Sequence, residues 1–402
     1  MPTIQKRGDT YRIRVSAGYD TTGKQIMRST TWKPDPGMTQ KQIEKELDRQ
    51  ALLFEEAVKT GRYTDGNIRF QDFAERWFAD YGKEHLKQRT YLRYQELTKR
   101  IYPAIGHIRL CKLQPHHLLE FYKQLAEPGQ KKSNKKDDDA PRSLAPKTIK
   151  AYHGLISSIL EKAVQWGVLQ DNPARRVDAP KAGRKQIQFL DDRQAVAFMQ
   201  ALDDEPLEYQ VIFTTLILTG MRRGELLGLE WPDIDFDNAT IHIRRTSQYA
   251  SGAGTYTDTP KTEQSKRTLV IPPELLDLLH QYRKEQIGRR LQLGDKWDAE
   301  WADHPRLFTQ WNGKPMFPNV PYIELQKILK RTGLPKVSLH SLRHTNATLL
   351  IGSGLDVRSV SGRLGHSQTS TTLNIYSEYL QSANAAASEI LADTLLRQKT
   401  TG

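Results

Sequence analysis

The sequence is poor in cysteine and has no long hydrophobic run. Cys111 is the one cysteine among 402 residues, which excludes an intrachain disulfide and a zinc site built from several cysteines. The longest apolar stretch, residues 211–221, contains three threonines and is shorter than the roughly 18 apolar residues of a membrane span. The first eight residues, M-P-T-I-Q-K-R-G, hold no apolar signal core. We therefore expect a cytoplasmic protein with no membrane partner.

Negative charge is also in deficit. Lysine and arginine total 60 against 47 aspartates and glutamates, which gives a net charge of +13. Such an excess favours a polyanionic partner, and nucleic acid more than a membrane, although many basic proteins bind no DNA. The hydrophobic content of 37% is ordinary for a folded protein, and 402 residues are enough for two or three domains.

Residues 1–64 are predicted to form a three-stranded sheet followed by one helix. Residues typical of strands occupy 4–7, 11–16 and 24–32, and the Pro34–Gly37 segment ends the sheet. A helix begins after Thr39, with its apolar face at Ile43, Leu47, Ala51, Phe54 and Val58. The basic residues of the sheet can lie against DNA or form an ordinary solvated surface. These residues are Lys6, Arg7, Arg12, Arg14, Lys24 and Arg28.

Residues 65–178 show helical periodicity only, and residues 179–402 show a mixed pattern. The first segment predicts four helices, one containing residues 70–78 and three at 90–102, 115–126 and 148–166, with a charged mobile loop at 128–146. The second predicts helices at 191–203, 207–219, 222–229, 273–290, 322–332, 339–352, 356–364 and 370–379, and strands at 240–246 and 267–271. The predicted fold class is therefore mainly α with small β sheets (α+β).

Six polar side chains from separate segments can form one active site. They are Arg222 in T-G-M-R-R-G-E, Lys261 in T-P-K-T, His340 and Arg343 in H-S-L-R, His366 in L-G-H, and Tyr376 in N-I-Y-S. Two arginines, a lysine and two histidines can surround one phosphate with positive charge and hydrogen-bond donors, and a tyrosine beside them can attack it. No acidic cage for a metal accompanies them. This set predicts phosphoryl transfer through a covalent protein–DNA intermediate, with no metal and no other cofactor.

Each of these signals is weak when taken alone. Glu225 follows Arg222 by three residues and can hold it for a phosphate, but the same spacing gives ordinary surface ion pairs. Lys266 competes with Lys261 as a proton donor, and Tyr379 competes with Tyr376 as the nucleophile. The pattern leaves both choices open.

The order of these residues and the sequence around them resemble the tyrosine recombinases, also called phage-type integrases. The resemblance covers about 68–380 and is carried by T-G-M-R-R-G-E-L-L-G-L, T-P-K-T-E-Q-S-K-R-T, L-H-S-L-R-H-T-N-A-T and L-G-H-S-Q-T-S-T-T-L-N-I-Y-S. It implies three domains: an arm-type DNA-binding domain at 1–64, a helical core-binding domain at 65–178 and a catalytic domain at 179–402. The match of 1–64 to the arm-binding domains of integrases from conjugative transposons and phages is the least specific of these.

The resemblance also implies a function, a site-specific recombinase that integrates and excises a mobile element. Its partners would be double-stranded attachment sites, three further copies in a tetramer on DNA, and an excisionase or a DNA-bending protein. Residues 383–396 would form a helix that docks on a neighbouring protomer. Two alternatives are a type IB topoisomerase-like enzyme and a catalytically silent DNA-binding regulator.

Overall fold

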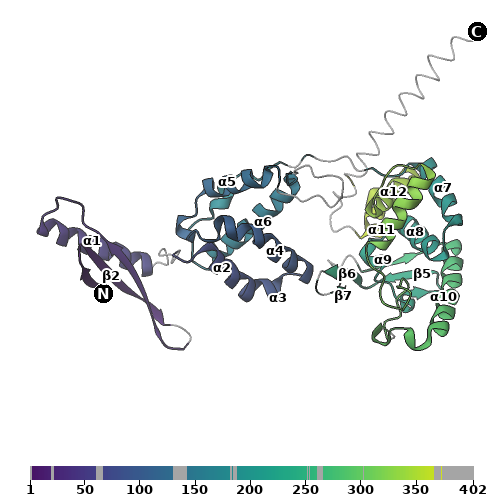
Figure 1. Cartoon of the computed structure of the whole chain (residues 1–402), viewed down its shortest axis with the longest axis horizontal. Helices are drawn as coiled ribbons and strands as arrows, with labels where there is room; N and C mark the ends of the chain where they lie inside the picture. Colours follow the sequence, from purple (N-terminus) through teal and green to yellow (C-terminus); the bar gives the residue numbers. More distant parts are fainter. Residues whose placement is uncertain are drawn as a thin grey trace, which may run out of the picture. The chain divides into compact units, whose positions relative to one another are not determined.

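The computed structural model describes residues 2–19, 22–59, 67–129, 143–181, 183, 188–250, 252, 254–259, 266–301, 303–365 and 373. The chain divides into two compact units, Met1–Arg184 and Lys185–Gly402. Helices dominate and the sheets are small and antiparallel, which confirms the predicted fold class (Figure 1). None of the helices described is both long enough and apolar enough to cross a membrane.

The chain begins with an antiparallel sheet in the order β1 (Thr3–Arg7), β2 (Thr10–Tyr19) and β3 (Gln25–Trp32), as predicted. Helix α1 (Gln40–Lys59) lies against this sheet (Figure 1). Strand alternation turns every second side chain of β2 toward α1, where these side chains pack in a small hydrophobic core. The core residues are Tyr11, Ile13, Val15, Leu47, Ala51 and Phe54.

The strand register divides the predicted basic residues between the two faces of this sheet. Arg12 and Arg14 alternate with the buried residues of β2 and therefore project from the face opposite α1. Lys6 is paired with Tyr11, and its ammonium lies 5.8 Å from the Tyr11 ring, on the side of the core. Arg28 is paired with the buried Val15. The sequence could not show this division because it depends on which residues oppose one another across the sheet.

Four longer helices with short extensions follow and share a second hydrophobic core. They are α2 (Phe70–Trp77), which continues through a π turn (Phe78–Gly82) into α3 (Lys83–His85), then α4 (Gln88–Ile101), α5 (Pro115–Ala126) and α6 (Pro146–Gln165). Another π turn (Tyr102–Gly106) and two 3₁₀ turns (Leu110–Lys112 and Pro173–Arg176) complete this part. The aromatic residues Phe70, Phe73 and Trp77 are fully or almost fully buried, so this stripe forms the core rather than a surface for stacking bases.

The second unit combines helices with a three-stranded sheet in the order β4-β5-β8 and a separate hairpin, β6-β7. Its helices are α7 (Asp192–Ala201), α8 (Leu207–Thr219), α9 (Arg223–Leu226), α10 (Pro273–Leu293), α11 (Val320–Thr332), α12 (Leu339–Gly352) and α13 (Val357–Leu364). Its strands are β4 (Ile234–Asp235), β5 (Thr240–Ile243), β6 (Thr246–Ala250), β7 (Gly254–Asp258) and β8 (Arg267–Val270). Short 3₁₀ turns occupy Leu202–Asp204, Trp231–Asp233, Gly294–Lys296 and Ala299–Trp301.

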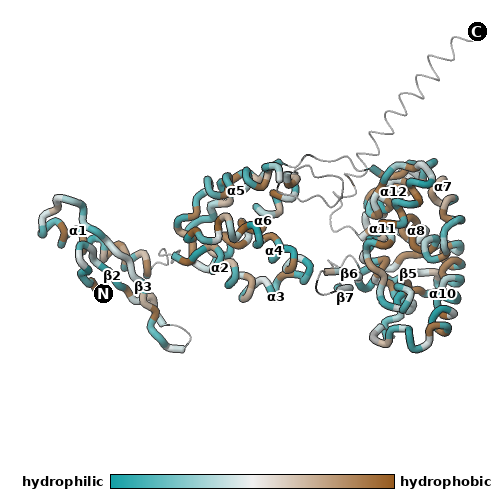
Figure 2. The backbone as a smooth tube through the Cα atoms, in the orientation of Figure 1, coloured by the Kyte–Doolittle hydropathy of each residue, from teal (hydrophilic) through white to brown (hydrophobic). Residues whose placement is uncertain are grey.

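Helix α8 is the centre of this unit. Nearly every residue in its second half is buried, and Figure 2 shows its backbone coloured as mainly hydrophobic. A helix that is apolar on all sides must be surrounded by other elements, and α8 contacts both α10 and α12. The stretch 211–221, which is too short for a membrane span, is therefore a core helix.

Two predicted elements of this unit are wrong in extent. The predicted helix 222–229 is a single turn, α9, and the predicted strand 240–246 is two strands separated after Ile243. The start of β6 packs closely on Gly228, just after α9: a Cβ atom there would lie 3.0 Å from the backbone nitrogen of Ser247 and 2.9 Å from the carbonyl oxygen of Arg245. The polar hairpin β6-β7 carries no hydrophobic alternation, which explains why the sequence did not predict it.

Several predicted features lie outside the described residues. They are most of the 128–146 loop, the helix 370–379 apart from Leu373, and the helix 383–396.

Gly220 offers a stability test of the contact between α8, α12 and α13. It ends α8 with φ of 63°, and a Cβ atom there would collide with Leu364 and lie 2.7 Å from Oδ1 of Asn346. We expect Gly220→Ala to lower the free energy of unfolding by about 2–4 kcal/mol, because strain at positive φ adds to overpacking. Gly333→Ala is the matched control, since Gly333 ends α11 with φ of 69° and no atom lies within 4 Å of its Cβ position. Equal losses in urea unfolding of the two variants would contradict the collision.

Candidate active site

Arg222 lies at the turn between α8 and α9. The left-handed Gly220 ends α8, and Arg222 then caps α9 in an extended conformation. Its backbone N–H donates to Oε2 of Glu225 at 3.0 Å, and its Nη1 donates to Oε1 of the same carboxylate at 2.6 Å. The three-residue spacing thus gives a capped first turn that fixes one side of the Arg222 guanidinium.

Glu225 is almost completely buried, with 1% of its side chain exposed. A second guanidinium, that of Arg267 at the start of β8, donates from Nη2 to Oε2 of Glu225 at 3.0 Å. Burial acts to raise the pKa of Glu225, but the charge of Arg267 and the hydrogen bonds from Arg267 and Arg222 outweigh it, so the pKa is lowered. The carboxylate is therefore ionised at neutral pH.

Arg343 is the buried cation of this site. It lies on α12, which begins with a capping box between Ser338 and Ser341, and its side chain is buried against the end of α8. Its Nη1 donates to the carbonyl oxygen of Gly220 at 2.8 Å. Its Nε and Nη2 have no hydrogen-bond partner among the described residues. Burial, and then the charge of Arg222, lower the pKa of Arg343 to about 9, so it still carries its charge at pH 7.

Two histidines share the first turns of α12 with Arg343. The rings of His340 and His344 meet edge to face, with centroids 4.8 Å apart. Desolvation, followed by the charges of Arg343 and Arg222, lowers the pKa of His340. Burial, followed by His340 and Arg343, lowers the pKa of the buried His344 to about 4. Both imidazoles are therefore neutral at pH 7, the state in which a ring nitrogen can accept a proton.

The end of α13 reaches the same place. Gly365 ends this helix in a left-handed conformation, and its carbonyl oxygen accepts a hydrogen bond of 2.9 Å from Nη2 of Arg222. Arg363 is the second-last residue of α13. Its carbonyl oxygen accepts a hydrogen bond of 2.7 Å from Nε of Arg267. Arg222 and Arg267 therefore both connect Glu225 to α13.

The structure thus brings together four of the seven residues that the sequence selected, Arg222, Glu225, His340 and Arg343. The other three, Lys261, His366 and Tyr376, lie outside the described residues. His366 directly follows Gly365, and Lys261 follows the end of β7 by three residues.

Arg267 and Arg363 belong to this cluster, and the sequence analysis did not select them. A signal for Arg267 was present: it alternates with the buried Leu269 and Ile271 and so falls on the inner face of its strand. An arginine on a buried face requires a partner. For Arg363, whose Nη2 donates to the carbonyl oxygen of Leu218 at 3.2 Å, the sequence holds no such signal.

The cluster has the electrostatic character of an anion site. Arg222 and Arg267 bind the Glu225 carboxylate, whose charge also acts on Arg343. Arg363 lies near Arg267, so four guanidinium groups accompany one carboxylate among the residues described above. Buried donors without an acceptor cost about 1–3 kcal/mol each, and an incoming phosphate oxygen would remove this cost at Arg343. A guanidinium already fixed by protein contacts can stabilise charge that develops on a phosphate without reorganising.

Two family models match the chain. Residues 188–382 match the phage integrase family, and residues 69–126 match the phage integrase N-terminal SAM-like domain. Among curated proteins, the chain is 25% identical over 98% of both lengths to the "Tyrosine recombinase XerC-like" of Caldanaerobacter subterraneus subsp. tengcongensis. It is also 25% identical to the "ICEBs1 integrase" of Bacillus subtilis, over 96% of this chain and 97% of that protein.

Solved structures share the fold. The Tn1549 transposon integrase in complex with transposon right end DNA has a TM-score of 0.62 at 22% identity, over 81% of this chain and all of that one. The lambda integrase dimer bound to a COC′ core site has a TM-score of 0.53 at 15% identity, over 93% and 94% of the two chains. The family matches cover most of the second unit and helices α2 to α5 of the first. The chain belongs to the phage integrase family, the tyrosine recombinases.

Proposed function

We propose that this chain is a site-specific DNA recombinase, an integrase that cuts and rejoins DNA strands through a 3′-phosphotyrosyl intermediate. The observation that carries the proposal is the buried guanidinium of Arg343, which has two donors without a partner among the described residues and lies beside the fixed Arg222. Family membership supports the same activity. The mobile elements named in the relatives support a role in integrating and excising such an element.

In the proposed reaction, the Tyr376 hydroxyl attacks the scissile phosphorus and the bond to the 5′ oxygen breaks. His340 accepts the tyrosine proton, and its lowered pKa supports a neutral base at pH 7. Arg222, Arg343 and His366 stabilise the pentacoordinate transition state, and Lys261 protonates the leaving 5′ oxygen. The 5′ hydroxyl then attacks the phosphotyrosine in the reverse sense, so rejoining needs no nucleotide cofactor.

The geometry around Arg222 supports a shared site for these groups. Arg222 donates to the carbonyl oxygen of Gly365, the residue directly before His366 in the sequence. The hairpin β6-β7 ends at Asp258, shortly before Lys261.

We propose double-stranded attachment sites as the substrate and a homotetramer as the working assembly. Solved relatives of the same fold include the lambda integrase tetramer bound to a Holliday junction. The proposed domains are an arm-binding domain at 1–64, a core-binding domain at 65–178 and a catalytic domain at 179–402, and a docking helix is proposed at 383–396. An excisionase or a DNA-bending protein is a further proposed partner. A type IB topoisomerase-like enzyme and a silent regulator are less well supported, because the matched family is that of the integrases.

The nucleophile can be tested by covalent capture. Tyr376→Phe should bind its DNA site but form no covalent adduct with a suicide substrate, because the attacking oxygen is missing. Tyr379→Phe is the matched control and should form the adduct normally. The measurement is a denaturing gel, and a normal adduct from Tyr376→Phe would move the assignment to Tyr379.

The general acid can be tested with a modified leaving group. Lys261→Ala should slow cleavage by about 10²–10⁴-fold, the usual effect of losing a positioned proton donor. A 5′-phosphorothiolate substrate, whose leaving group needs little protonation, should restore most of the rate. If this substrate restores the cleavage rate of Lys266→Ala but not that of Lys261→Ala, the general acid is Lys266.

Glu225 tests whether the buried carboxylate positions Arg222. Glu225→Gln keeps the shape of the side chain but removes the charge between Arg222 and Arg267, so single-turnover cleavage should fall by about 10²-fold as the guanidinium shifts. DNA affinity at fixed salt should change by less than about threefold, because lysine and arginine contacts to the DNA backbone supply most of the binding free energy. Glu274→Gln, an exposed substitution at the start of α10, is the control. Cleavage within twofold of wild type by a folded Glu225→Gln would rule out the positioning role.

A further inference from the structure

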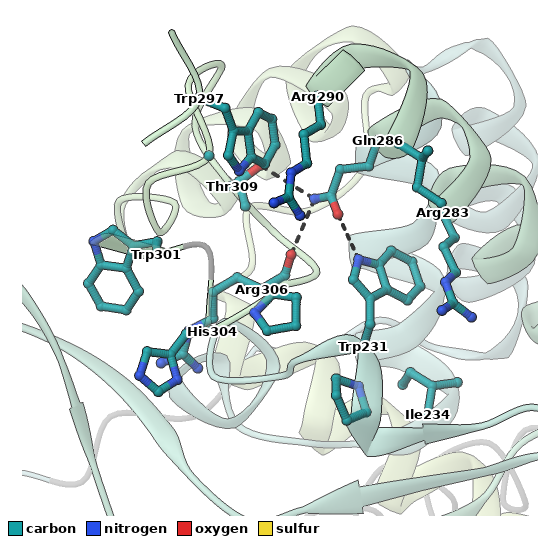
Figure 3. A pocket seen from close by; sticks show the side chains of 14 residues that line it. Trp231, Ile234, Arg283, Gln286, Arg290, Trp297, Trp301, His304, Arg306 and Thr309 are labelled. Carbon is teal, nitrogen blue, oxygen red and sulfur yellow. Dashed lines mark hydrogen bonds between the residues drawn. The ribbon is translucent and has the colours of Figure 1, made fainter. Parts of the chain in front are cut away.

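A second concave site lies on the α10 side of the second unit, away from the arginine cluster. Its cavity has a volume of about 430 Å³ and is lined by α10, the turn Trp231–Asp233 and the segment 297–313 (Figure 3). None of its lining residues belongs to the Arg222–Arg343 cluster. A cavity of this size falls in the range that holds small ligands, roughly 300–1,000 Å³.

Indole rings and arginines dominate the walls. Trp231, Trp297 and Trp301 contribute three indoles, and Arg283, Arg290 and Arg306 contribute three guanidinium groups. Trp297 packs so closely on Gly313, which has φ of 86°, that any Cβ atom at position 313 would collide with the indole. The contact with Gly313 therefore helps to fix the position of the Trp297 ring.

The neutral amide in the pocket is already fully engaged. Gln286 accepts a hydrogen bond of 2.6 Å from Nε1 of Trp231, and its Nε2 donates to the carbonyl oxygen of Arg306 (Figure 3). Nε2 also donates to the carbonyl oxygen of Leu307. The bond to Nε1 fixes the Trp231 ring. The charged groups that remain for a ligand are guanidinium donors.

Two of the three arginines of the pocket have no carboxylate partner among the described residues, whereas Nη1 of Arg306 lies 3.5 Å from Oε1 of Glu230. Arg283 and Arg290 are exposed, and neither forms an ion pair with a carboxylate within the described part of the chain. The guanidinium of Arg283 lies 5.6 Å from the centre of the Trp231 ring. Arg306 is 97% buried, yet its Nε has no hydrogen-bond partner among the described residues. This nitrogen is itself buried, so the exposed Arg283 and Arg290 are the cations that a ligand in the pocket can reach.

We propose that this pocket binds a nucleobase together with its phosphate. A flat heterocycle presents its face to an indole and its ring nitrogens and carbonyl oxygens to N–H donors. Arg283 and Arg290 each offer forked donors that match a phosphate, and in Figure 3 their guanidinium groups point in different directions. The guanidinium groups of Arg283 and Arg306 already lie over the Trp231 and Trp301 rings, so a heterocycle would stack on the indole faces that remain. An anion would pair with Arg283 and Arg290. Free nucleotides and a nucleotide of bound DNA share this chemistry.

Occupancy of the pocket has a route to the proposed active site through Arg306. Its Nη1 donates to the carbonyl oxygen of Gly228, just after α9, at 2.5 Å, and its Nη2 donates to Oγ1 of Thr257 on β7 at 2.5 Å. Thr257 lies four residues before Lys261. A ligand that packs against Arg306 therefore contacts a residue that already connects the end of α9 with the hairpin.

Calorimetric titration of the full-length chain with AMP tests whether the pocket binds a free nucleotide. We expect saturable binding of AMP and at least about tenfold weaker binding of adenosine and of ribose 5-phosphate, which each lack one half of the ligand. Arg283→Ala and Arg290→Ala should each weaken AMP binding by about tenfold or more, because each removes a charge-assisted contact. Lys284→Ala is the matched control, an exposed cation on α10 that does not line the pocket. Melting curves establish that each variant is folded.

A second titration uses duplex DNA at fixed salt in place of AMP, and tests whether the pocket binds a nucleotide of DNA. If the bound nucleotide belongs to DNA, AMP gives no heat, and Arg283→Ala and Arg290→Ala lower DNA affinity by about tenfold relative to Lys284→Ala. The inference is overturned if AMP gives no heat and the three variants bind DNA equally. It is equally overturned if AMP binds but Arg283→Ala and Arg290→Ala leave its affinity unchanged. Neither arm requires strand cleavage, so failure here leaves the proposed recombinase activity untouched.

Discussion

The buried carboxylate of Glu225 is the contact on which the arginine cluster depends. Ionised groups lose several kcal/mol of hydration when they are buried, and they are tolerated only when partners replace the water. Here Arg222 and Arg267 supply those partners, and the same two guanidinium groups hold carbonyl oxygens at and near the end of α13. One charge therefore fixes α9, β8 and α13 relative to one another. Removing it would leave two cations close together with nothing between them.

Arg343 shows the opposite situation, a buried charge whose hydrogen bonds are incomplete among the described residues. It donates to Gly220 but has two donors without an acceptor there. Such incomplete satisfaction costs stability, and proteins retain it where a substrate completes the set. Glu225 and Arg343 thus have different roles. Glu225 makes the framework rigid. Arg343 is held by α12 and the carbonyl oxygen of Gly220, and its remaining N–H groups have no acceptor among the described residues.

Much of the fold could be predicted from periodicity, and the failures have a common cause. The core helices α6 and α8 repeat apolar residues over several turns, so local pattern located them well. Helix α9 was predicted too long because its end is set by the close approach of β6 to Gly228, a contact between segments about 17 residues apart. The hairpin β6-β7 was missed because its residues are polar on both faces. Pattern also placed Arg222 and Glu225 together, but it could not choose between Lys261 and Lys266 or between Tyr376 and Tyr379, since each pair lies a few residues apart in similar local sequence.

The sequence by itself determined the helical character of the chain, its positive charge, the first sheet with its helix, and the set of side chains able to surround a phosphate. These properties are written in composition and short-range spacing. Only the tertiary structure decided that Arg267 and Arg363 join the cluster, that the Arg343 guanidinium meets a carbonyl 123 residues away, and that indoles and arginines enclose a second cavity. Contacts between residues so distant in the chain depend on how helices and strands pack, and packing is set by the shape of the whole unit rather than by any local pattern.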